Sequence, residues 1–411
     1  MKTESVDVLV IGAGPAGTIA AAMLHKYGHK VKIVEKEKFP RFVIGESLLP
    51  RVMDHLEEAG LLEAVKKENF QEKFGAKFVR DGVVCDFNFS EKFSNGWTWT
   101  WQVPRARFDK VLADTVEAMG VSIDFQTAVT DIKFSGTDSV TTVIDKDGVE
   151  KTIAAKFIVD ASGYGRVIPR MFNLDKPSNF ESRKTHFAHL TDELRPPGLD
   201  GNRITVVVHE MRTWIWIIPF SNGVTSVGYV ADPEFFAELP ADPEARMRAL
   251  IAADPTLKDR FKDAETVLPA RTIEGYAIST KQLYGEGFVL CGNATEFLDP
   301  VFSSGVTFAM ESGNRASKLV SKFLKSEEVN WEKEYTEYMM QGINTFRSYV
   351  HGWYNGNLHE IFFAKTPNPE IMRQICSVLA GYVWDMENPF VKKHDQVLGT
   401  LSRVIRIDSE V

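Results

Sequence analysis

The sequence predicts an α/β protein in which a doubly wound nucleotide-binding domain is joined to an antiparallel β-sheet domain and a helical C-terminal region. Three patterns support this prediction. An apolar strand ends in a glycine-rich turn and a helix near the N-terminus, short strand patterns fill residues 185–275, and helical patterns dominate from residue 304 onward. The 411 residues are enough for two intimately packed domains.

The first element is the apolar run Val6–Ile11, which is typical of a buried parallel strand. It leads into a Gly-x-Gly-x-x-Gly turn at Gly12, Gly14 and Gly17 and then into a helical pattern over Thr18–Lys26. In such a turn the first glycine allows the tight bend and the second lets the backbone approach a pyrophosphate. The third lets the helix pack closely on the strand, and the helix N-terminus offers N–H groups to phosphate.

The second strand pattern, Lys30–Val34, ends at Glu35, whose carboxylate is then placed to bond a ribose hydroxyl. The alternative is a glycine-rich turn that binds no nucleotide. Strand, glycine motif, helix, strand and acidic residue all occur in the required order, which favours a dinucleotide site.

Composition excludes several function classes. The formal net charge is −8, so the chain lacks the basic surface of a nucleic-acid-binding protein. Its three cysteines are scattered without metal-ligand spacing and indicate a reducing compartment, so we expect a cytoplasmic protein without a metal site. The apolar stretch 8–24 contains glycines and a proline and fits the nucleotide fold better than a membrane span, so no transmembrane segment is expected.

Further elements follow in order up to the second domain. The patterns predict a helix over Pro50–Leu62, strands within 74–90, a helix over Arg107–Met119, a strand over Ser122–Thr127, a hairpin turn at Asp145–Gly148 and a strand over Lys156–Val159.

Three tryptophans, Trp97, Trp99 and Trp101, alternate with threonines and are predicted to share one face of a strand. Two interpretations stay open for them. They form either a packed sheet face or the aromatic wall of a substrate pocket.

The patterns over residues 185–275 predict a separate layer of antiparallel strands. Its predicted elements are the strands Ile204–His209, Thr213–Ile218 and Thr225–Val230, an Asn222-Gly223 turn, and a helix over Ala241–Ala253. The strand Gly287–Leu290 then returns to the nucleotide-binding sheet. The helical region that follows is interrupted near 352–357 and 366–369.

A helix is predicted to begin near Ser304, directly after the stretch Asp299–Ser303. Its positive N-terminal end can stabilise an anionic reduced flavin or hold a halide. The alternative is a helix that Ser303 or Ser304 simply caps, and the two are compatible because they use the same helix end.

These motifs together resemble the flavin-dependent halogenase family, within the FAD aromatic-hydroxylase superfamily and its glutathione-reductase-type fold. The resemblance runs over nearly the whole chain. Besides the glycine motif and Glu35, the stretch 102–109 resembles the family segment whose first arginine, here Arg105, meets FAD, and Asp160–Gly163 resembles the Asp-Gly motif. Gly292-Asn293 stands where the family has Gly-Asp. The amide oxygen of asparagine can still accept a hydrogen bond from a hydroxyl group. It lacks the negative charge of aspartate, which weakens that contact.

Two matches are specific to halogenases. Trp214 to Pro219 fits Trp-x-Trp-x-Ile-Pro, and in the family these tryptophans line the passage between flavin and substrate. By spacing alone they would be two buried tryptophans of a strand. The stretch 70–78 resembles the segment carrying the active-site lysine, which is Lys73 here, although its position alone proves nothing.

The resemblance implies a reaction in which reduced FAD, oxygen and chloride or bromide yield hypohalous acid. Lys73 would then hold the oxidant by a hydrogen bond or carry it as a haloamine, and a desolvated ammonium with a lowered pKa suits both roles. Tryptophan-specific halogenases have a glutamate two residues before the position of Ser304, where this chain has Phe302. It therefore resembles the phenol- and pyrrole-type branch, whose small aromatic substrates are often bound to a carrier protein. No second nucleotide motif marks a nicotinamide site, which favours a separate flavin reductase.

The resulting site prediction has two sets of residues. The catalytic set is Lys73, Trp214, Trp216, Ser304 and Gly305. The FAD-binding set is Gly12, Gly14, Ala16, Gly17, Glu35, Lys36, Arg41, Ser47, Arg105, Asp160, Gly163, Gly292, Asn293, Pro300, Gly305 and Val306. Alternative functions are an aromatic hydroxylase, a prenyl-lipid reductase and a non-catalytic flavin-binding protein.

The predicted domain boundaries assign the chain in six segments. They are an FAD-binding domain at 1–80, 105–184 and 281–330, substrate-domain strands at 81–104, a substrate domain at 185–280, and a helical C-terminal region at 331–411.

Overall fold

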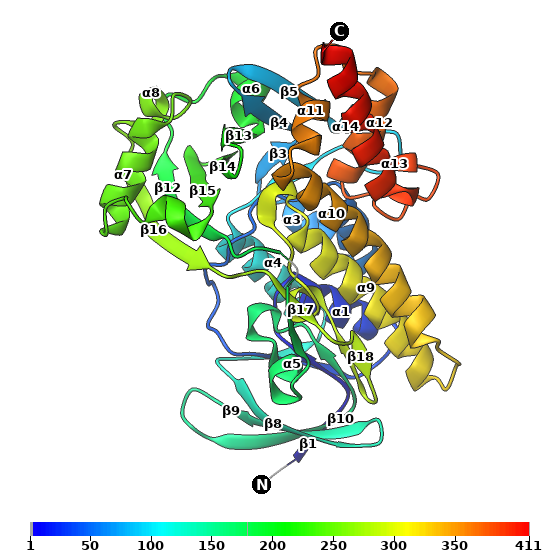
Figure 1. Cartoon of the computed structure of the whole chain (residues 1–411). Helices are drawn as coiled ribbons and strands as arrows, with labels where there is room; N and C mark the ends of the chain where they lie inside the picture. Colours follow the sequence, from blue (N-terminus) through cyan, green and yellow to red (C-terminus); the bar gives the residue numbers. More distant parts are fainter. Residues whose placement is uncertain (1–2, 179, 411) are drawn as a thin grey trace.

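A computed structural model describes residues 3–178 and 180–410 and places two large sheets at an angle to each other, with helices between and beside them (Figure 1). The sheet that contains the N-terminal strand lies at the bottom of the view. The second sheet lies at the upper left, and the C-terminal helices lie at the upper right (Figure 1). This mixed α/β arrangement confirms the predicted fold class.

The first sheet has the order β18-β19-β10-β1-β2-β7, in which β19, β10, β1, β2 and β7 run parallel. The hairpin β8–β9 adds to the first half of β10 in antiparallel fashion. The strands are β1 Thr3–Ile11, β2 Val31–Glu35, β7 Ser122–Phe125, β8 Ala128–Ser135, β9 Asp138–Ile144, β10 Glu150–Asp160, β18 Tyr284–Gly285 and β19 Phe288–Leu290.

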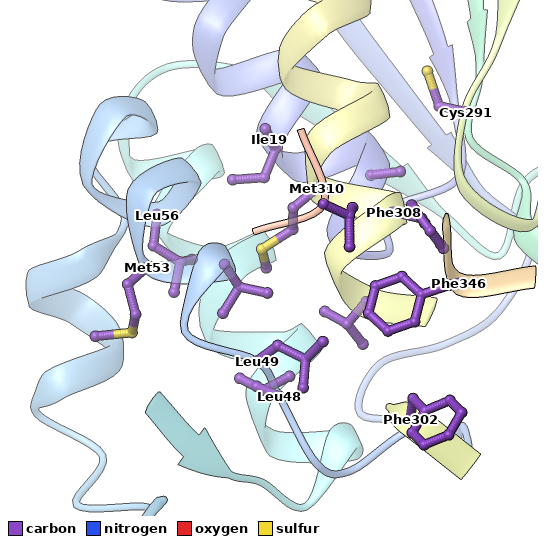
Figure 2. Close-up of a cluster of buried hydrophobic side chains, with 14 of the residues drawn as sticks. Ile19, Leu48, Leu49, Met53, Leu56, Cys291, Phe302, Phe308, Met310 and Phe346 are labelled. Atoms are coloured by element: carbon purple, nitrogen blue, oxygen red, sulfur yellow. The ribbon is translucent and has the colours of Figure 1, made fainter. Parts of the chain in front are cut away.

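Helix α1 (Pro15–Lys26) is buried along most of its length between this sheet and α9 (Gly305–Leu324). The two helices approach closely at Gly313, where a Cβ atom would overlap the carbonyl oxygen of Ala16. Figure 2 shows the apolar layer beside α9, with Ile19 of α1, Leu56 of α2 (Arg51–Ala59) and Met310 of α9 among the clustered side chains.

The second sheet has the order β16-β12-β15-β14-β13-β4-β5 and is antiparallel except for the pair β13–β4. Along β14, Trp214 and Trp216 face the main core, while Ile215 and Ile217 face a separate core. This second core lies under α7 (Pro243–Ala253) and α8 (Lys258–Phe261). The sheet is therefore buried on both faces at its central strand β14, whereas its edge strands β5 and β16 are partly exposed. Its strands are β4 Gly75–Arg80, β5 Val83–Asn88, β12 Lys184–Thr191, β13 Ile204–Glu210, β14 Thr213–Pro219, β15 Val224–Ala231 and β16 Thr266–Glu274.

Two small two-stranded sheets complete the β-structure. They are β3 Gln71–Lys73 with β6 Thr100–Gln102, and β11 Asp175–Pro177 with β17 Ile278–Thr280.

The C-terminal helices pack beside α9. Phe308 of α9 and Phe346 of α10 meet edge to face, with their ring centroids 5.6 Å apart. The remaining helices are α2 Arg51–Ala59, α3 Leu62–Lys66, α4 Arg105–Ala118, α5 Val167–Met171, α6 Gly198–Asn202, α7 Pro243–Ala253, α8 Lys258–Phe261, α10 Tyr338–Tyr354, α11 Asn357–Phe362, α12 Pro369–Leu379, α13 Pro389–Lys392 and α14 His394–Glu410. Within 3–178 and 180–410, none of the helices is both long and apolar enough to cross a bilayer.

The structure corrects three sequence predictions. The helix predicted over Pro50–Leu62 is two helices, because Gly60 adopts a left-handed conformation after α2. The helix after the glycine motif begins at Pro15 rather than Thr18, because proline is well suited to a first helical position.

The predicted domain boundaries are not tested and stay a prediction. They place β4 in the FAD-binding segment 1–80, whereas β4 pairs with β13 and β5 in the second sheet.

The third correction concerns the tryptophan stretch. Only its end is a strand, β6, while Trp97 and Trp99 lie in an irregular segment. The three rings still contact one another, with centroids 6.0 Å apart for Trp97 and Trp99 and 5.0 Å apart for Trp99 and Trp101. None of the three lines the large cavity described below, so the packing interpretation fits the structure better.

Candidate flavin and halogen-transfer site

A cavity of about 860 Å³ lies where the first sheet meets the second. It is lined by the glycine turn after β1, the segment 41–47, the start of α9, and the core-facing side chains of β13 and β14. Most of the predicted site residues line it. These are Gly12, Gly14, Ala16, Glu35, Lys36, Arg41, Ser47, Arg105, Gly163, Trp214, Trp216, Gly292, Asn293, Pro300, Gly305 and Val306.

The nucleotide end of the cavity has the geometry that a dinucleotide needs. Gly12 has a φ of +100°, and a Cβ atom there would lie 2.5 Å from the carbonyl oxygen of Ala161. Helix α1 begins after Gly14 with no side chain capping its N-terminus, so its first N–H groups are available to phosphate. The buried carboxylate of Glu35 accepts hydrogen bonds from the backbone N–H groups of Ala13 and Glu37, both at 2.8 Å, and lies at the cavity wall.

Two arginines of the cavity share one buried carboxylate. Asp109, which is 1% exposed, accepts hydrogen bonds from Arg105 Nε at 2.8 Å and Arg105 Nη2 at 3.1 Å, and from Arg41 Nη1 at 2.8 Å. A Cβ atom on Gly14 would lie 3.5 Å from Arg41 Nη2, so this guanidinium sits next to the predicted pyrophosphate site. Asp109 was not among the predicted site residues, although its position one helical turn after Arg105 could have indicated the ion pair.

We expect Asp109→Asn to weaken FAD binding by at least about tenfold, because a buried guanidinium loses its anionic partner and its fixed orientation. Fluorescence titration of the apoprotein with FAD measures this. Asp114→Asn is the matched control, since Asp114 lies on the same helix and pairs with Lys110 at the surface. Equal FAD affinity in both variants would mean that the shared carboxylate does not orient the arginines toward the cofactor.

Four predicted residues do not line the cavity: Gly17, Asp160, Lys73 and Ser304. Gly17 has a packing role, since a Cβ atom there would overlap the carbonyl oxygen of Gly12. Asp160 is fully buried, and its carboxylate accepts hydrogen bonds from the backbone N–H groups of Ser162 and Ile168. It therefore holds the loop whose residues line the cavity, and in the structure it contacts the site through that loop.

Lys73 lies behind the segment 44–48, on β3, and is 2% exposed. Its ammonium donates to Ser47 Oγ at 2.8 Å and to the Leu48 carbonyl oxygen at 2.7 Å. Ser47 itself lines the cavity, so one residue separates the lysine from the flavin region. Burial, reinforced by the charge of Arg203, lowers the pKa of the Lys73 ammonium to about 7.

Lys73 and Lys77 do not share a face of one strand, as they would if residues 73–79 were a continuous strand. The chain breaks at Phe74, so Lys73 belongs to the small sheet with β6 and Lys77 to the second large sheet. Lys77 pairs with Asp200 at 2.5 Å.

The start of α9 forms the opposite wall. Ser303, with a φ of +58°, and Gly305 line the cavity, and the first N–H groups of this 20-residue helix have no intrahelical partner. Ser304 is the N-cap residue, as the capping interpretation predicted, but its side chain makes no capping hydrogen bond. Phe302 turns away and packs against Phe78, Tyr349 and Trp353, so it does not fill this end of the cavity.

Comparison with known proteins identifies the family. A family model described as an FAD binding domain matches residues 5–257. The chain is 30% identical to the 1H-pyrrole-2-carbonyl-[peptidyl-carrier protein] chlorinase of Pseudomonas fluorescens, over 93% of this chain and 91% of that protein. It belongs to the flavin-dependent halogenase family.

Solved structures agree with this assignment. The fold matches a flavin-dependent brominase with a TM-score of 0.85 and 26% identity, covering 99% of this chain and 100% of that one. It also matches a protein from Cytophaga hutchinsonii described as a flavoprotein/dehydrogenase, with a TM-score of 0.97 and 65% identity over 99% and 100% of the two chains.

The protein is thus an FAD-dependent oxidoreductase of the halogenase type, and a halide is the co-substrate of this family. The cavity fits FAD: its glycine turn, its uncapped helix end and Glu35 suit the dinucleotide. Among the described residues, no group of three or more His, Cys, Asp or Glu side chains is arranged to hold a metal ion.

Proposed function

We propose that this protein halogenates an electron-rich aromatic ring, phenolic or pyrrolic, that is bound to a carrier protein. In this proposal the reduced flavin comes from a separate reductase. Bound, reduced FAD supplies the electrons with which oxygen converts chloride or bromide into hypohalous acid. The residues of the chain then have to hold the halide, guide the oxidant and position it at the substrate.

The observation that carries the proposal is the environment of Lys73. Burying an ammonium without an anionic partner is costly, and no carboxylate within the described residues forms an ion pair with Lys73. Its donors go to a hydroxyl and a carbonyl oxygen, and its pKa of about 7 leaves much of it as a neutral amine at neutral pH. A buried amine of this kind, one residue away from a flavin cavity, fits a role in chemistry better than a role in stability.

Each wall of the cavity takes a part in the proposed reaction. The N–H groups of Gly305 and Val306, at the positive end of α9, are the proposed halide site. Trp214 and Trp216 present an apolar face that keeps the organic substrate from the flavin. Lys73 receives the hypohalous acid, either as a hydrogen-bond donor to its oxygen or as the amine that accepts the halogen and releases water.

A carrier-bound substrate is supported by the relative from Pseudomonas fluorescens, whose name specifies a pyrrole on a peptidyl-carrier protein. Phe302 supports a ring that needs no carboxylate base, since it stands where tryptophan-specific halogenases carry a glutamate and it packs in the core. Electron-rich phenols and pyrroles lose their proton readily after halogen addition.

The test is a competition assay read by mass spectrometry. The protein is supplied with FAD, a flavin reductase, oxygen and bromide, together with a pyrrole-2-carboxyl thioester on a carrier protein and the free pyrrole acid and phenols. We expect the bromine isotope pattern on the carrier-bound ring. Bromination of the free compounds at an equal rate would contradict the carrier requirement, and a hydroxylated product without bromine would favour an aromatic hydroxylase.

A further inference from the structure

A chain of hydrogen bonds leads away from one of the two cavity tryptophans. Trp214 Nε1 donates to Tyr354 Oη at 3.0 Å, and Tyr354 Oη donates to Asp299 Oδ2 at 2.9 Å. The direction is fixed, because an indole N–H can only donate, so the tyrosine oxygen accepts and its own proton points to the carboxylate. The other oxygen of Asp299 accepts the backbone N–H of Val301 at 3.0 Å.

The two ends of this hydrogen-bond chain are shielded from water, and Tyr354 between them is half-buried. Trp214 is 2% exposed and Asp299 is 5% exposed. The guanidinium of Arg183 lies over the Tyr354 ring, 4.0 Å from its centroid, and is itself held by an ion pair with Asp232. The tyrosine is thus fixed through both its ring and its hydroxyl group.

These three residues come from three different parts of the fold. Trp214 lies on β14, Asp299 immediately precedes the turn 300–303 that leads to the start of α9, and Tyr354 is the last residue of α10. Trp216 differs, since its indole N–H donates to Ser226 of the neighbouring strand at 3.0 Å. Of the two motif tryptophans, Trp214 alone is thus held by the C-terminal helices.

We propose that Tyr354 and Asp299 are positioning residues that fix the Trp214 indole as part of the cavity wall and so confine the oxidised halogen on its way to Lys73. The proposal rests on the proposed function. With the chain intact, the indole cannot rotate without breaking its bond to Tyr354, and the same carboxylate holds the turn that leads into the halide end of the cavity. Without the Tyr354 hydroxyl, the Trp214 N–H and Asp299 both lose a partner and the wall becomes mobile.

Tyr354→Phe tests this, because it removes both hydrogen bonds and keeps the ring under Arg183. We expect halogenated product per reduced flavin to fall by roughly tenfold. Free hypohalous acid, trapped in bulk solution by a 1,3-diketone, should rise in proportion, while FAD affinity stays within about twofold of the parent protein. A general structural defect would lower both product and trapped oxidant.

Tyr338→Phe is the matched control. Tyr338 lies on the same helix, and its hydroxyl also donates to a buried carboxylate, that of Glu311 at 2.6 Å. Neither Tyr338 nor Glu311 lines the cavity, whereas Tyr354 is bonded to Trp214, which does. This variant should lose thermal stability without changing the ratio of product to free oxidant. An unchanged ratio in Tyr354→Phe, or the same change in both variants, would overturn the proposal.

A readout that needs no turnover separates this proposal from the proposed function. Near-ultraviolet circular dichroism of the apoprotein should change in Tyr354→Phe, and that change should vanish in a Trp214→Phe background if it arises from this indole. An equal change in both backgrounds would contradict the positioning role. If the parent protein forms no oxidised halogen at all, the proposed function fails, whereas the spectroscopic comparison still decides whether Tyr354 holds Trp214.

Discussion

Replacing Lys73 with alanine is expected to reduce halogenated product by between about a hundredfold and ten-thousandfold, the range that a positioned proton-transfer group contributes. The variant should still bind FAD, because Lys73 does not line the cavity and reaches it only through Ser47. It should also still consume reduced flavin and release peroxide. Mass spectrometry of the product, fluorescence titration with FAD and a peroxide assay measure these three quantities on the same preparation.

Two further variants sharpen this prediction. Lys73→Arg keeps a positive charge but cannot release a proton near neutral pH, so it should fail as badly as alanine. Lys77→Ala is the control, because Lys77 lies four residues away in another sheet and pairs with Asp200. Full product formation in Lys73→Ala would show that the oxidant does not pass through this amine.

The lowered pKa of Lys73 has a signature in stability that is independent of turnover. The unfolded lysine keeps its proton up to about pH 10.5, whereas the folded one loses it above about pH 7. Between these values the unfolded state binds more protons, so this group makes the free energy of unfolding rise with pH. Lys73→Met should therefore be more stable than the parent at pH 6–7, with a flatter dependence of stability between pH 7 and 10. If Lys73→Met were instead less stable than the parent at neutral pH, the hydrogen bonds of Lys73 would have to offset the cost of burying its charge.

Glu311→Gln is expected to destabilise the protein by about 3–5 kcal/mol, because it removes one partner from a buried charged cluster. Glu311, 3% exposed on α9, accepts hydrogen bonds from Arg51 Nε at 2.9 Å and Tyr338 Oη at 2.6 Å, and His55 Nε2 lies 2.9 Å away. These contacts join α2 and α10 to α9. The variant should show a thermal midpoint lower by several degrees.

The pH dependence of this contribution follows from its pKa. Burial alone would raise the pKa of Glu311, but the charges and hydrogen bonds of His55 and Arg51 hold it well below 4.5. Its stabilisation is complete above the ordinary carboxyl pKa and is lost as the pH falls below about 4.5. The stability gap between the parent and Glu311→Gln should therefore shrink on acidification.

Glu58→Gln is the control, since Glu58 joins α2 to α9 through Lys318 and Asn314 at a partly exposed position. A loss as large in Glu58→Gln would mean that burial of the Glu311 cluster is unimportant.

The sequence was sufficient wherever function follows from local chain geometry. The strand, glycine turn, helix and Glu35 form one contiguous unit, and its predicted site residues all line the cavity except Gly17, which has a packing role. The common face of the two tryptophans on β14 could also be predicted, because alternation along a strand puts the side chains of Trp-x-Trp on one face.

Contacts between distant segments could not be predicted in this way. Trp214 and Tyr354 are 140 residues apart, and Glu311 and His55 are 256 residues apart, so no local pattern records either pair. The break at Phe74, which sends Lys73 and Lys77 into different sheets, depends on pairing with β6 rather than on the composition of the stretch. Asp160 stays a predicted FAD-binding residue, but the sequence did not show its bond to the backbone N–H of Ile168, which lies beyond the Asp160–Gly163 motif.

The most direct test of halogen transfer through this site is a single turnover of the reduced FAD complex with oxygen and an accepted aromatic substrate, with and without bromide. The product of each reaction is identified by mass spectrometry. We predict a brominated product that appears only with bromide and disappears in Lys73→Ala, while flavin oxidation proceeds in every case. An oxygenated product that forms regardless of bromide, or bromination that survives in Lys73→Ala, would contradict it.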